Sequence, residues 1–355
     1  MKLRMAATRV HRWLGLACLA FWAIQALTGV LIVFHWEMDD ALVPGARTAI
    51  DPAAIERRIE ALTPDGSGGS VGSVWESGGV PGRFDLYLDG PDGSSVVRID
   101  GQGTVLRERA DGEMLAHGGW IDTLVVVHHN LLAGDTGSWI VGISGAVLLV
   151  SLLLGLVSAW PRRGQWRSAL FPRRGGAGSV ASTYSWHRAL GLWVAVPALM
   201  TVAAGTMMVF SGVVEAIVEP PPVEAPESTG VSKRDVGFAT AVAAAQAAYP
   251  DARLSGVNLP SADTPFYKVR LLQPGESRRV YGTTTVYVRA DNGLVTARHD
   301  ALVDGPRRSF ADGLFPFHTG EMGGLFGRLL VLATGLWLLT MVVLGLALWR
   351  KRSRR

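Results

Sequence analysis

Apolar residues gather in four long runs, and polar segments separate each run from the next. A helix needs about 20 residues to cross the hydrocarbon core of a bilayer, because it rises roughly 1.5 Å per residue. All four runs reach that length, and none contains an acidic residue. They are Trp13–Phe34, Trp139–Trp160, Ala189–Val214 and Arg328–Trp349. The pattern predicts an α-helical membrane protein with four transmembrane helices.

The two long polar segments, 37–120 and 219–317, have a mixed pattern. Each opens with a helix-like stretch, Pro52–Leu62 or Val236–Tyr249, and continues with short alternating runs typical of strands. The predicted strands are Arg83–Leu88, Ser95–Ile99, Thr104–Arg107, Phe266–Leu271, Thr284–Arg289 and Leu294–Ala297. The Gly66–Ser70 and Pro220–Pro222 stretches are predicted to be loops. We therefore expect two α+β domains between the helices.

Basic residues predict how the helices are oriented. The leader 1–12, the connector 161–188 and the tail 350–355 hold four, six and five basic residues and no acid. The positive-inside rule predicts that these three segments are cytoplasmic and that both α+β domains lie on the far side. The remaining segments carry all 30 acidic residues and are net negative. The basic pI therefore reflects topology and does not indicate nucleic-acid binding.

These patterns divide the chain into seven segments. The first helix is too long for a signal peptide and lacks a cleavage site, so we expect it to be retained. Cys18 is the only cysteine, which excludes an internal disulfide and covalently attached c-type haem. The expected segments are a leader with helix one (1–36), an α+β domain (37–120), helix two with its pre-helix (121–160), a cytoplasmic loop (161–186), helix three (187–218), an α+β domain (219–317), and helix four with the tail (318–355).

The chain is a duplicated unit. The stretch that begins at His11 is repeated at His187, and Gly29 then falls on Gly205 at the same offset of 176 residues. A second offset of 190 residues relates His128 to His318 and also matches a series of glycines. These glycine matches are Gly103/Gly293, Gly134/Gly324, Gly137/Gly327, Gly145/Gly335 and Gly155/Gly345. Because both halves begin in the cytoplasm, they form a parallel repeat.

Four of the eight histidines occupy equivalent positions in the two halves. His11 and His187 lie at cytoplasmic helix ends, and His128 and His318 lie just before the outer ends. A membrane thickness should separate these two levels, so the histidines are expected to pair across the repeat axis, one pair at each face. His129 is interpreted as a neighbouring group or an alternative ligand. His35, His117 and His299 are interpreted as ordinary surface or interface residues.

Two imidazoles that face each other across an axis are suited to axial ligation of haem iron. Gly15, Gly191, Gly29 and Gly205 would then allow close approach of the macrocycle. Arg12 and Arg188 directly follow the inner histidines and are candidates to pair with propionates, or they are simply part of the positive-inside signal. Zinc or copper is an alternative, although such sites usually recruit further ligands. Hydrogen bonding across the helices is the other alternative.

The distance from His128 to Trp160 raises a question of length. A continuous helix over these residues would be roughly 48 Å long, which exceeds a bilayer core. Either the outer histidines lie above the core, or the helices break near Gly134–Gly137 and Gly320–Gly324.

These motifs together resemble the PepSY-associated transmembrane helix family over nearly the whole chain. The motifs are His11-Arg12-Trp13-Leu14-Gly15-Leu16 with Thr28-Gly29, His128 with Gly134 and Gly137, His187-Arg188 with Leu190-Gly191-Leu192-Trp193, and His318-Thr319-Gly320-Glu321 with Trp349-Arg350. The resemblance implies two periplasmic PepSY-like domains and a bacterial inner-membrane location. It also implies two b-type haems, outward electron flow and ferric-siderophore reduction during iron uptake.

On this interpretation, a cytoplasmic flavin or nicotinamide reductase, or quinol in the bilayer, would supply electrons. The chain lacks a dinucleotide-binding fingerprint of its own. The acceptor would be a periplasmic ferric siderophore or another iron chelate. One alternative is a non-enzymatic binding or regulatory protein that acts through its PepSY-like domains. A transporter is less favoured, because the predicted helices carry no charge at the membrane midplane.

Overall fold

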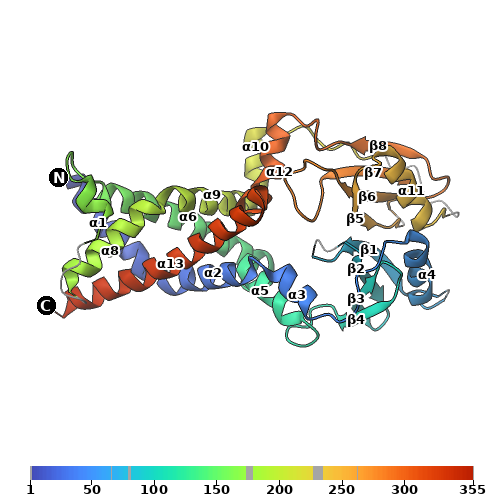
Figure 1. Cartoon of the computed structure of the whole chain (residues 1–355), viewed down its shortest axis with the longest axis horizontal. Coiled ribbons are helices and arrows are strands. Elements are labelled where there is room, and N and C mark those ends of the chain that lie inside the picture. The colour runs from blue at the N-terminus through green and yellow to red at the C-terminus, as the bar shows by residue number, and fades with distance from the viewer. Residues whose placement is uncertain are drawn as a thin grey trace. The chain divides into compact units, whose positions relative to one another are not determined.

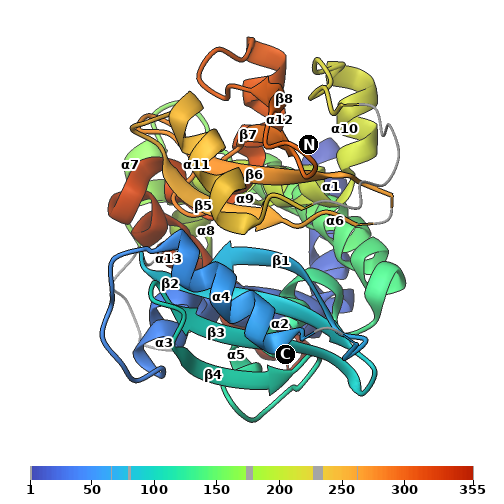
Figure 2. The ribbon, with the colours of Figure 1, turned by 90° about the vertical axis from the view of Figure 1, so that its right-hand side faces the viewer.

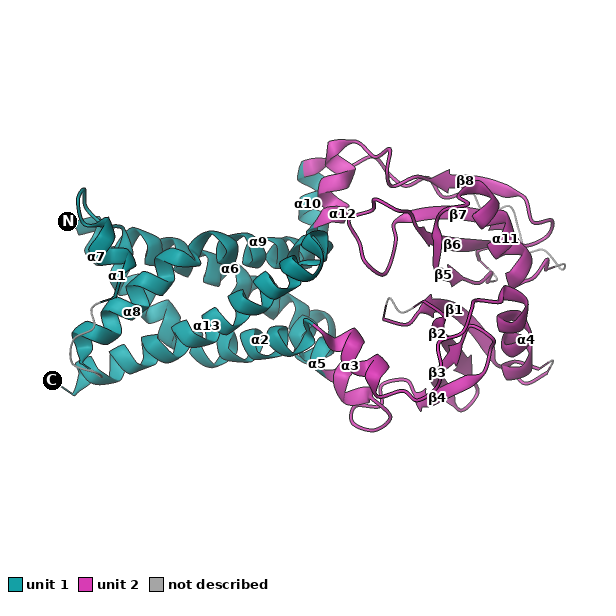
Figure 3. Ribbon diagram, viewed as in Figure 1, with its two compact units in different colours: residues 1–33, 124–217, 314–355 teal, residues 34–123, 218–313 magenta. Residues whose placement is uncertain are grey.

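The computed structural model describes residues 2–64, 66–78, 81–172, 179–226, 235–261 and 263–354. It divides into two compact units (Figures 1 and 3). The helical unit comprises Met1–Val33, Leu124–Ile217 and Leu314–Arg355, and the sheet unit comprises Phe34–Thr123 and Val218–Gly313. Arg173, Arg174 and Arg355, which belong to the predicted cytoplasmic charge, lie outside the described residues.

Two helices of the helical unit are long and apolar enough to cross a membrane, namely α6 (Gly134–Ala159) and the stretch Glu321–Ser353. The latter joins the short turn η1 (Glu321–Gly323) to α13 (Gly324–Ser353). Two further stretches qualify only as bent pairs: α1 (Lys2–Ala17) with α2 (Leu19–Ile32), and α8 (Val180–Trp193) with α9 (Ala195–Val209). The described chain therefore has two spanning helices, or four spans if each bent pair crosses as one.

The two bends are equivalent in the repeat and exchange helix partners. The backbone leaves helical geometry at Cys18 and at Val194, which are 176 residues apart, and the pairs bend by 68° and 63°. Before the bend, α1 packs on α6 and α8 packs on α13, so each lies against the long helix of its own half. After the bend, α2 packs on α13 and α9 packs on α6. The bends thus interlock the two halves of the helical unit.

The outer histidines lie on helices that are separate from the long spans. Helix α5 (Gly119–Asn130) ends before α6, and α12 (Pro306–His318) ends before η1. Gly134 and Gly324 have φ of 54° and 58°, which glycine adopts at little cost. A side chain at Gly137 or Gly327 would clash with the carbonyl of Asn130 or Gly320, respectively. Of the two alternatives that the length allowed, the structure has the helix breaks, and the repeated glycines make them possible.

The sheet unit contains one antiparallel sheet of eight strands in the order β4-β3-β2-β1-β5-β6-β7-β8. The first polar segment supplies α3 (His35–Ala41), α4 (Pro52–Leu62), β1 (Ser70–Glu76), β2 (Arg83–Gly90), β3 (Gly93–Asp100) and β4 (Val105–Ala110). The second supplies α11 (Phe238–Ala248), β5 (Arg253–Asn258), β6 (Phe266–Leu272), β7 (Thr284–Arg289) and β8 (Val295–His299) after α10 (Ser211–Val218). Helix α7 (Trp166–Leu170) belongs to the helical unit. Each segment contributes helices and four strands, as an α+β domain would, and the strands of both segments share one sheet.

The core of the sheet unit lies between the sheet and two equivalent helices, α4 and α11, which cover the same face (Figure 2). Asp51 caps α4 by accepting hydrogen bonds from the amides of Ala53 and Ala54. Ile55 and Ile59 of α4 and Val242 of α11 are buried against alternate strand residues. Burial of apolar surface contributes about 25 cal/mol per Å², so this buried cluster stabilises the unit.

The two halves of the sheet join at β1 and β5, the two strands that the sequence pattern does not predict. Val74 pairs with Val257, and both are fully buried. Each strand contains a bulge, between Val71 and Ser73 in β1 and between Leu254 and Gly256 in β5. A bulge inserts a residue and so disturbs the alternation of buried and exposed positions that identifies a strand.

A buried acid at this junction predicts a pH-dependent stability. Glu76 of β1 is fully buried and lies 3.0 Å from Arg253 of β5. Burial raises its pKa from 4.5 to about 7, although Arg253 acts in the opposite direction. Between these values the folded chain holds a proton that the unfolded chain has lost, so the free energy of unfolding should fall as pH rises from 4.5 to 7.

Urea unfolding at several pH values measures this dependence, whose total size is at most roughly 3 kcal/mol. The Glu76→Gln variant should lose the dependence and be at least as stable as the wild type at pH 8. An unchanged pH profile in this variant would show that another group is responsible.

Candidate metal centres

The structure brings the four repeat-related histidines together as two pairs within the helical unit. The rings of His11 on α1 and His187 on α8 have centroids 6.3 Å apart and planes inclined by 55°. The rings of His128 on α5 and His318 on α12 also have centroids 6.3 Å apart, with an interplanar angle of 34°. These are the two pairs that the repeat predicts.

Each of the four rings lies against a helix glycine. A Cβ at Gly29 of α2 would lie 3.0 Å from Cε1 of His128, and one at Gly205 of α9 would lie 2.6 Å from Cε1 of His318. In the other pair, a Cβ at Gly155 of α6 would lie 3.1 Å from Cε1 of His11, and one at Gly345 of α13 would lie 3.8 Å from Cε1 of His187. The sequence predicts a role for Gly29 and Gly205, which in the structure contact the histidine rings. Gly155 and Gly345 are found in the repeat but have no role assigned from sequence.

Gly15 and Gly191 were also expected to allow close approach, but their surroundings differ. No atom lies within 4 Å of a Cβ placed at Gly15, and the nearest atom at Gly191 is the methyl group of Met341 at 3.4 Å. Their contacts are looser than those of the glycines that face a histidine ring.

Hydrogen bonds define the tautomer of three of the four histidines. Nδ1 of His11 lies 2.8 Å from the Ser151 carbonyl, and Nδ1 of His318 lies 2.8 Å from the Thr201 carbonyl. A carbonyl only accepts, so each Nδ1 carries the proton and each Nε2 is left with its lone pair. This is the state in which a histidine binds a metal while its other nitrogen is held by a neighbour.

His128 reaches the same state through a hydroxyl group. Its Nδ1 lies 3.1 Å from Oγ1 of Thr28, whose own proton is donated to the Ile24 carbonyl at 2.8 Å. The hydroxyl oxygen therefore accepts from Nδ1 of His128. His187 differs, because its Nδ1 is buried and has no hydrogen-bond partner among the described residues. Met341 stands in the second half where Ser151 stands in the first, so the polar partner of His11 has no equivalent.

The two pairs lie closer together than the sequence suggested. Two glycines of α13 mark the levels of the two pairs. Gly335 packs against Val30, which is next to the Gly29 that contacts His128. Gly345 contacts His187 of the other pair. Ten residues of helix correspond to roughly 15 Å. This is about half of the 30 Å hydrocarbon thickness that the sequence placed between the pairs. The difference arises because the helix breaks let α5 and α12 place their histidines alongside the long helices.

The ring spacing and ligand number suit a metal that takes two imidazoles. Metal–imidazole nitrogen bonds are about 2 Å, so one metal between two facing rings sets the centroids roughly 6 Å apart. Within the described part of the chain, neither pair joins a third histidine, cysteine or carboxylate in a cluster with ligand atoms within 4.8 Å. A structural zinc site would require four such ligands. All four histidines are partly exposed in the described structure.

The other predicted site residues lie outside the two pairs. His129 is exposed, and its ring centroid is 6.2 Å from that of His128. The guanidinium of Arg12 lies over the Trp13 ring at 5.4 Å, and Nε of Arg188 donates to the Ala159 carbonyl at 2.8 Å. Both arginines thus contact protein groups, and Arg188 does so at the C-terminal end of α6.

The three remaining histidines have separate environments. His35 stacks near Trp36 with centroids 4.7 Å apart, and exposed His117 lies 3.1 Å from Glu113. His299 belongs to the sheet unit and lies 3.2 Å from Asp304.

Comparison with known proteins agrees with this arrangement of repeated helices. The family model described as the PepSY-associated TM region matches residues 8–352. No curated protein matches the chain. Because the family model covers nearly the whole chain, this membrane protein belongs to the PepSY-associated TM family.

Proposed function

We propose that the chain is a di-haem electron-transfer protein of the bacterial inner membrane. It would accept electrons from a cytoplasmic flavin or nicotinamide reductase, or from quinol, and reduce a periplasmic ferric siderophore or similar iron chelate. The observation that carries the proposal is the pair of equivalent bis-histidine sites, each with a centroid spacing of 6.3 Å. Haem supplies reversible one-electron transfer when it is bound.

The protein residues have three roles in this proposal. His11 and His187 would hold one b-type haem, and His128 and His318 would hold the other. The Ser151, Thr201 and Thr28 oxygens orient three of the rings and keep their Nε2 atoms deprotonated. Such hydrogen bonds raise the basicity of a ligand, so the site with the unpartnered His187 Nδ1 has the weaker donor set.

The orientation in the membrane is part of the proposal and follows from charge. Arg4 donates to the carbonyls of Ser158 and Trp160, and Arg188 donates to that of Ala159. These contacts place basic groups at the C-terminal end of α6, where they also complement the helix dipole. With this end cytoplasmic, the His11–His187 pair lies nearer the cytoplasm and the His128–His318 pair lies nearer the periplasm.

Haem analysis of the purified full chain tests the proposal. We expect a sharp haem absorption band that shifts on reduction, and two haems per chain that acidified organic solvent extracts, because no Cys-x-x-Cys-His motif tethers them. One haem per chain would contradict the two-site arrangement. A protein without a haem band would instead favour the binding or regulatory alternative.

A further inference from the structure

The sheet has a second face, opposite α4 and α11, and its charges differ between the two halves. In the first half this face carries Asp85 on β2 and Arg98 on β3, which form a two-pronged ion pair at 2.7 and 2.8 Å. Asp39 of α3 also binds Arg98, at 2.5 Å, and Arg107 of β4, at 2.7 Å. Acidic and basic groups therefore neutralise one another on this side.

Strand register identifies the equivalent positions in the second half. Asp85 lies opposite Arg98 across β2 and β3, and Lys268 lies opposite Tyr287 across β6 and β7. A lysine thus stands where the first half has an acid, and a tyrosine stands where it has an arginine. Arg270, two residues along β6, points to the same face because side chains alternate along a strand. The second half has lost the acid and retained positive charge.

A cavity of about 400 Å³ opens over this part of the sheet. Four cationic side chains line it, together with hydroxyl groups that include Thr285 and Tyr287. The cations are Lys268, Arg270, Arg278 and Arg308.

Two of these cations form no ion pair within the described chain. Lys268 and Arg270 make no ion pair with any described residue, and Nε of Arg270 is buried without a hydrogen-bond partner. Burial and the neighbouring Arg270 lower the pKa of Lys268. Buried cations in folded proteins are paired or hydrated, so an anion that enters this cavity would find two cationic side chains without an ion-pair partner.

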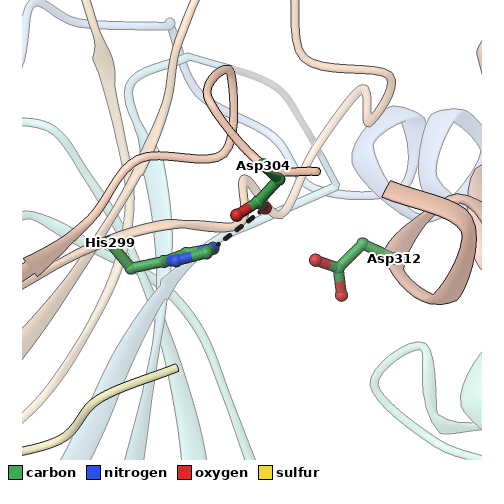
Figure 4. Close-up of side chains that lie close together, drawn as sticks. All are labelled: His299, Asp304 and Asp312. Carbon is green, nitrogen blue, oxygen red and sulfur yellow. Dashed lines mark ion pairs between the residues drawn. The ribbon is translucent and has the colours of Figure 1, made fainter. Parts of the chain in front are cut away.

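Asp312 lines the cavity and Asp304 lies beside it, and Figure 4 shows Asp304 paired with the His299 ring. Asp304 pairs with the His299 ring at 3.2 Å, and Asp312 of α12 forms a two-pronged ion pair with Arg308 at 2.9 and 3.0 Å. The ligand atoms of His299, Asp304 and Asp312 lie within 4.8 Å of one another, which resembles a loose cation site. Asp312 also attracts Arg270 electrostatically, but Arg308 holds both of its oxygens, so neither acid forms an ion pair with Lys268 or Arg270.

We propose that the cavity over β6, β7 and β8 binds a small polyanion through carboxylate or phosphate oxygens. Its volume lies within the usual range of about 300–1,000 Å³ for small-molecule sites. Arginine suits this chemistry because its planar guanidinium binds two oxygens at once. Tyr287 adds a hydroxyl group to the lining of the cavity, whereas the Thr285 hydroxyl already donates to the Thr283 carbonyl.

The proposed anion site shares no residue with the two histidine pairs. Together with the proposed function, and resting on it, it implies that the iron chelates that bind here carry free anionic groups.

Calorimetric titration of the full chain with citrate and with pyrophosphate tests the site at constant ionic strength. At least one of the two should bind, and Lys268→Asp should weaken that binding at least tenfold, because it recreates the acid of the first half. Arg270→Gln should weaken binding in the same direction and does not introduce a new charge. Binding of citrate alone would identify carboxylates as the recognised groups, and binding of pyrophosphate alone would identify phosphates.

The matched control is Arg307→Gln, since Arg307 precedes Arg308 on α12 but is largely exposed and does not line the cavity. This variant should bind as the wild type does. The inference is wrong if neither anion binds the wild type, or if Lys268→Asp and Arg270→Gln both bind unchanged. The titration needs neither haem nor electron transfer, so its outcome is independent of the proposed function.

Discussion

Replacing His318 with alanine should reduce the haem content from two per chain to one. The His318 and His128 ring centroids are 6.3 Å apart, and within the described chain no third ligand forms a cluster with them within 4.8 Å, so one imidazole alone would have to hold the group. Extraction and pyridine-based quantification of haem measure the loss. The His128→Ala variant should lose the same spectral component.

Double variants then distinguish the two pairs. Residues that act as one unit are strongly non-additive, so His128→Ala with His318→Ala should retain the haem content of either single variant. Combining His11→Ala with His318→Ala should instead empty both sites. His129→Ala is the matched control, because this exposed neighbour should leave the content near two. If His128→Ala keeps the wild-type haem content and His129→Ala loses one haem, then His129 and not His128 is the ligand.

The glycine contacts allow the same site to be tested with every histidine in place. A methyl group at Gly205 would lie 2.6 Å from the His318 ring, closer than real contacts allow, so Gly205→Ala must displace the ring. Gly15→Ala introduces the same group where nothing lies within 4 Å and should be silent. Equal haem content in the two variants would show that ring position is not critical.

Replacing Arg98 with alanine should destabilise the sheet unit by roughly 3–5 kcal/mol, because it leaves the mostly buried carboxylate of Asp85 without its ion-pair partner and Asp39 with Arg107 alone. The side chain of Arg98 is 6 % exposed, and Asp39 and Asp85 are each 14 % exposed. Burial favours the neutral form of Asp39, yet Arg107 and Arg98 outweigh it and lower the pKa of this carboxyl. Urea unfolding of the full chain, with hydrogen exchange of β2 and β3, locates and measures the loss.

Two further variants separate charge from packing. Arg57→Ala removes an exposed arginine whose partner Asp51 lies 3.9 Å away, and its effect should stay within about 0.5 kcal/mol. Adding Asp85→Asn to Arg98→Ala should recover part of the stability, since one stranded charge is then removed. No recovery would mean that the lost packing of the arginine, and not the stranded charge, dominates.

The amino-acid sequence by itself determined the repeat and predicted the histidine pairs, with His129 left open as an alternative to His128. Helix α4 runs from Pro52 to Leu62 as the apolar spacing predicts, and both hairpin turns fall at Gly103 and Gly293 as the offset predicts. The equivalence of His11 with His187, and of His128 with His318, required only that two halves of one chain fold alike. Periodicity, length and internal symmetry depend only on the order of residues, so they can be recognised without knowledge of the tertiary contacts.

Tertiary structure decided what depends on contacts between distant residues. The bulges in β1 and β5 hide both strands from a pattern of alternation, yet these strands unite the two α+β segments in one sheet. The bends at Cys18 and Val194 lie within continuous apolar runs; no proline or charge marks the first, and Pro197 in the first turn of α9 marks the second without fixing its angle. The choice between His128 and His129 as the partner of His318, and the roughly 15 Å between the pairs, follow from how the broken helices pack. Such features depend on which surfaces meet in space, and neighbouring residues along the chain carry little information about that.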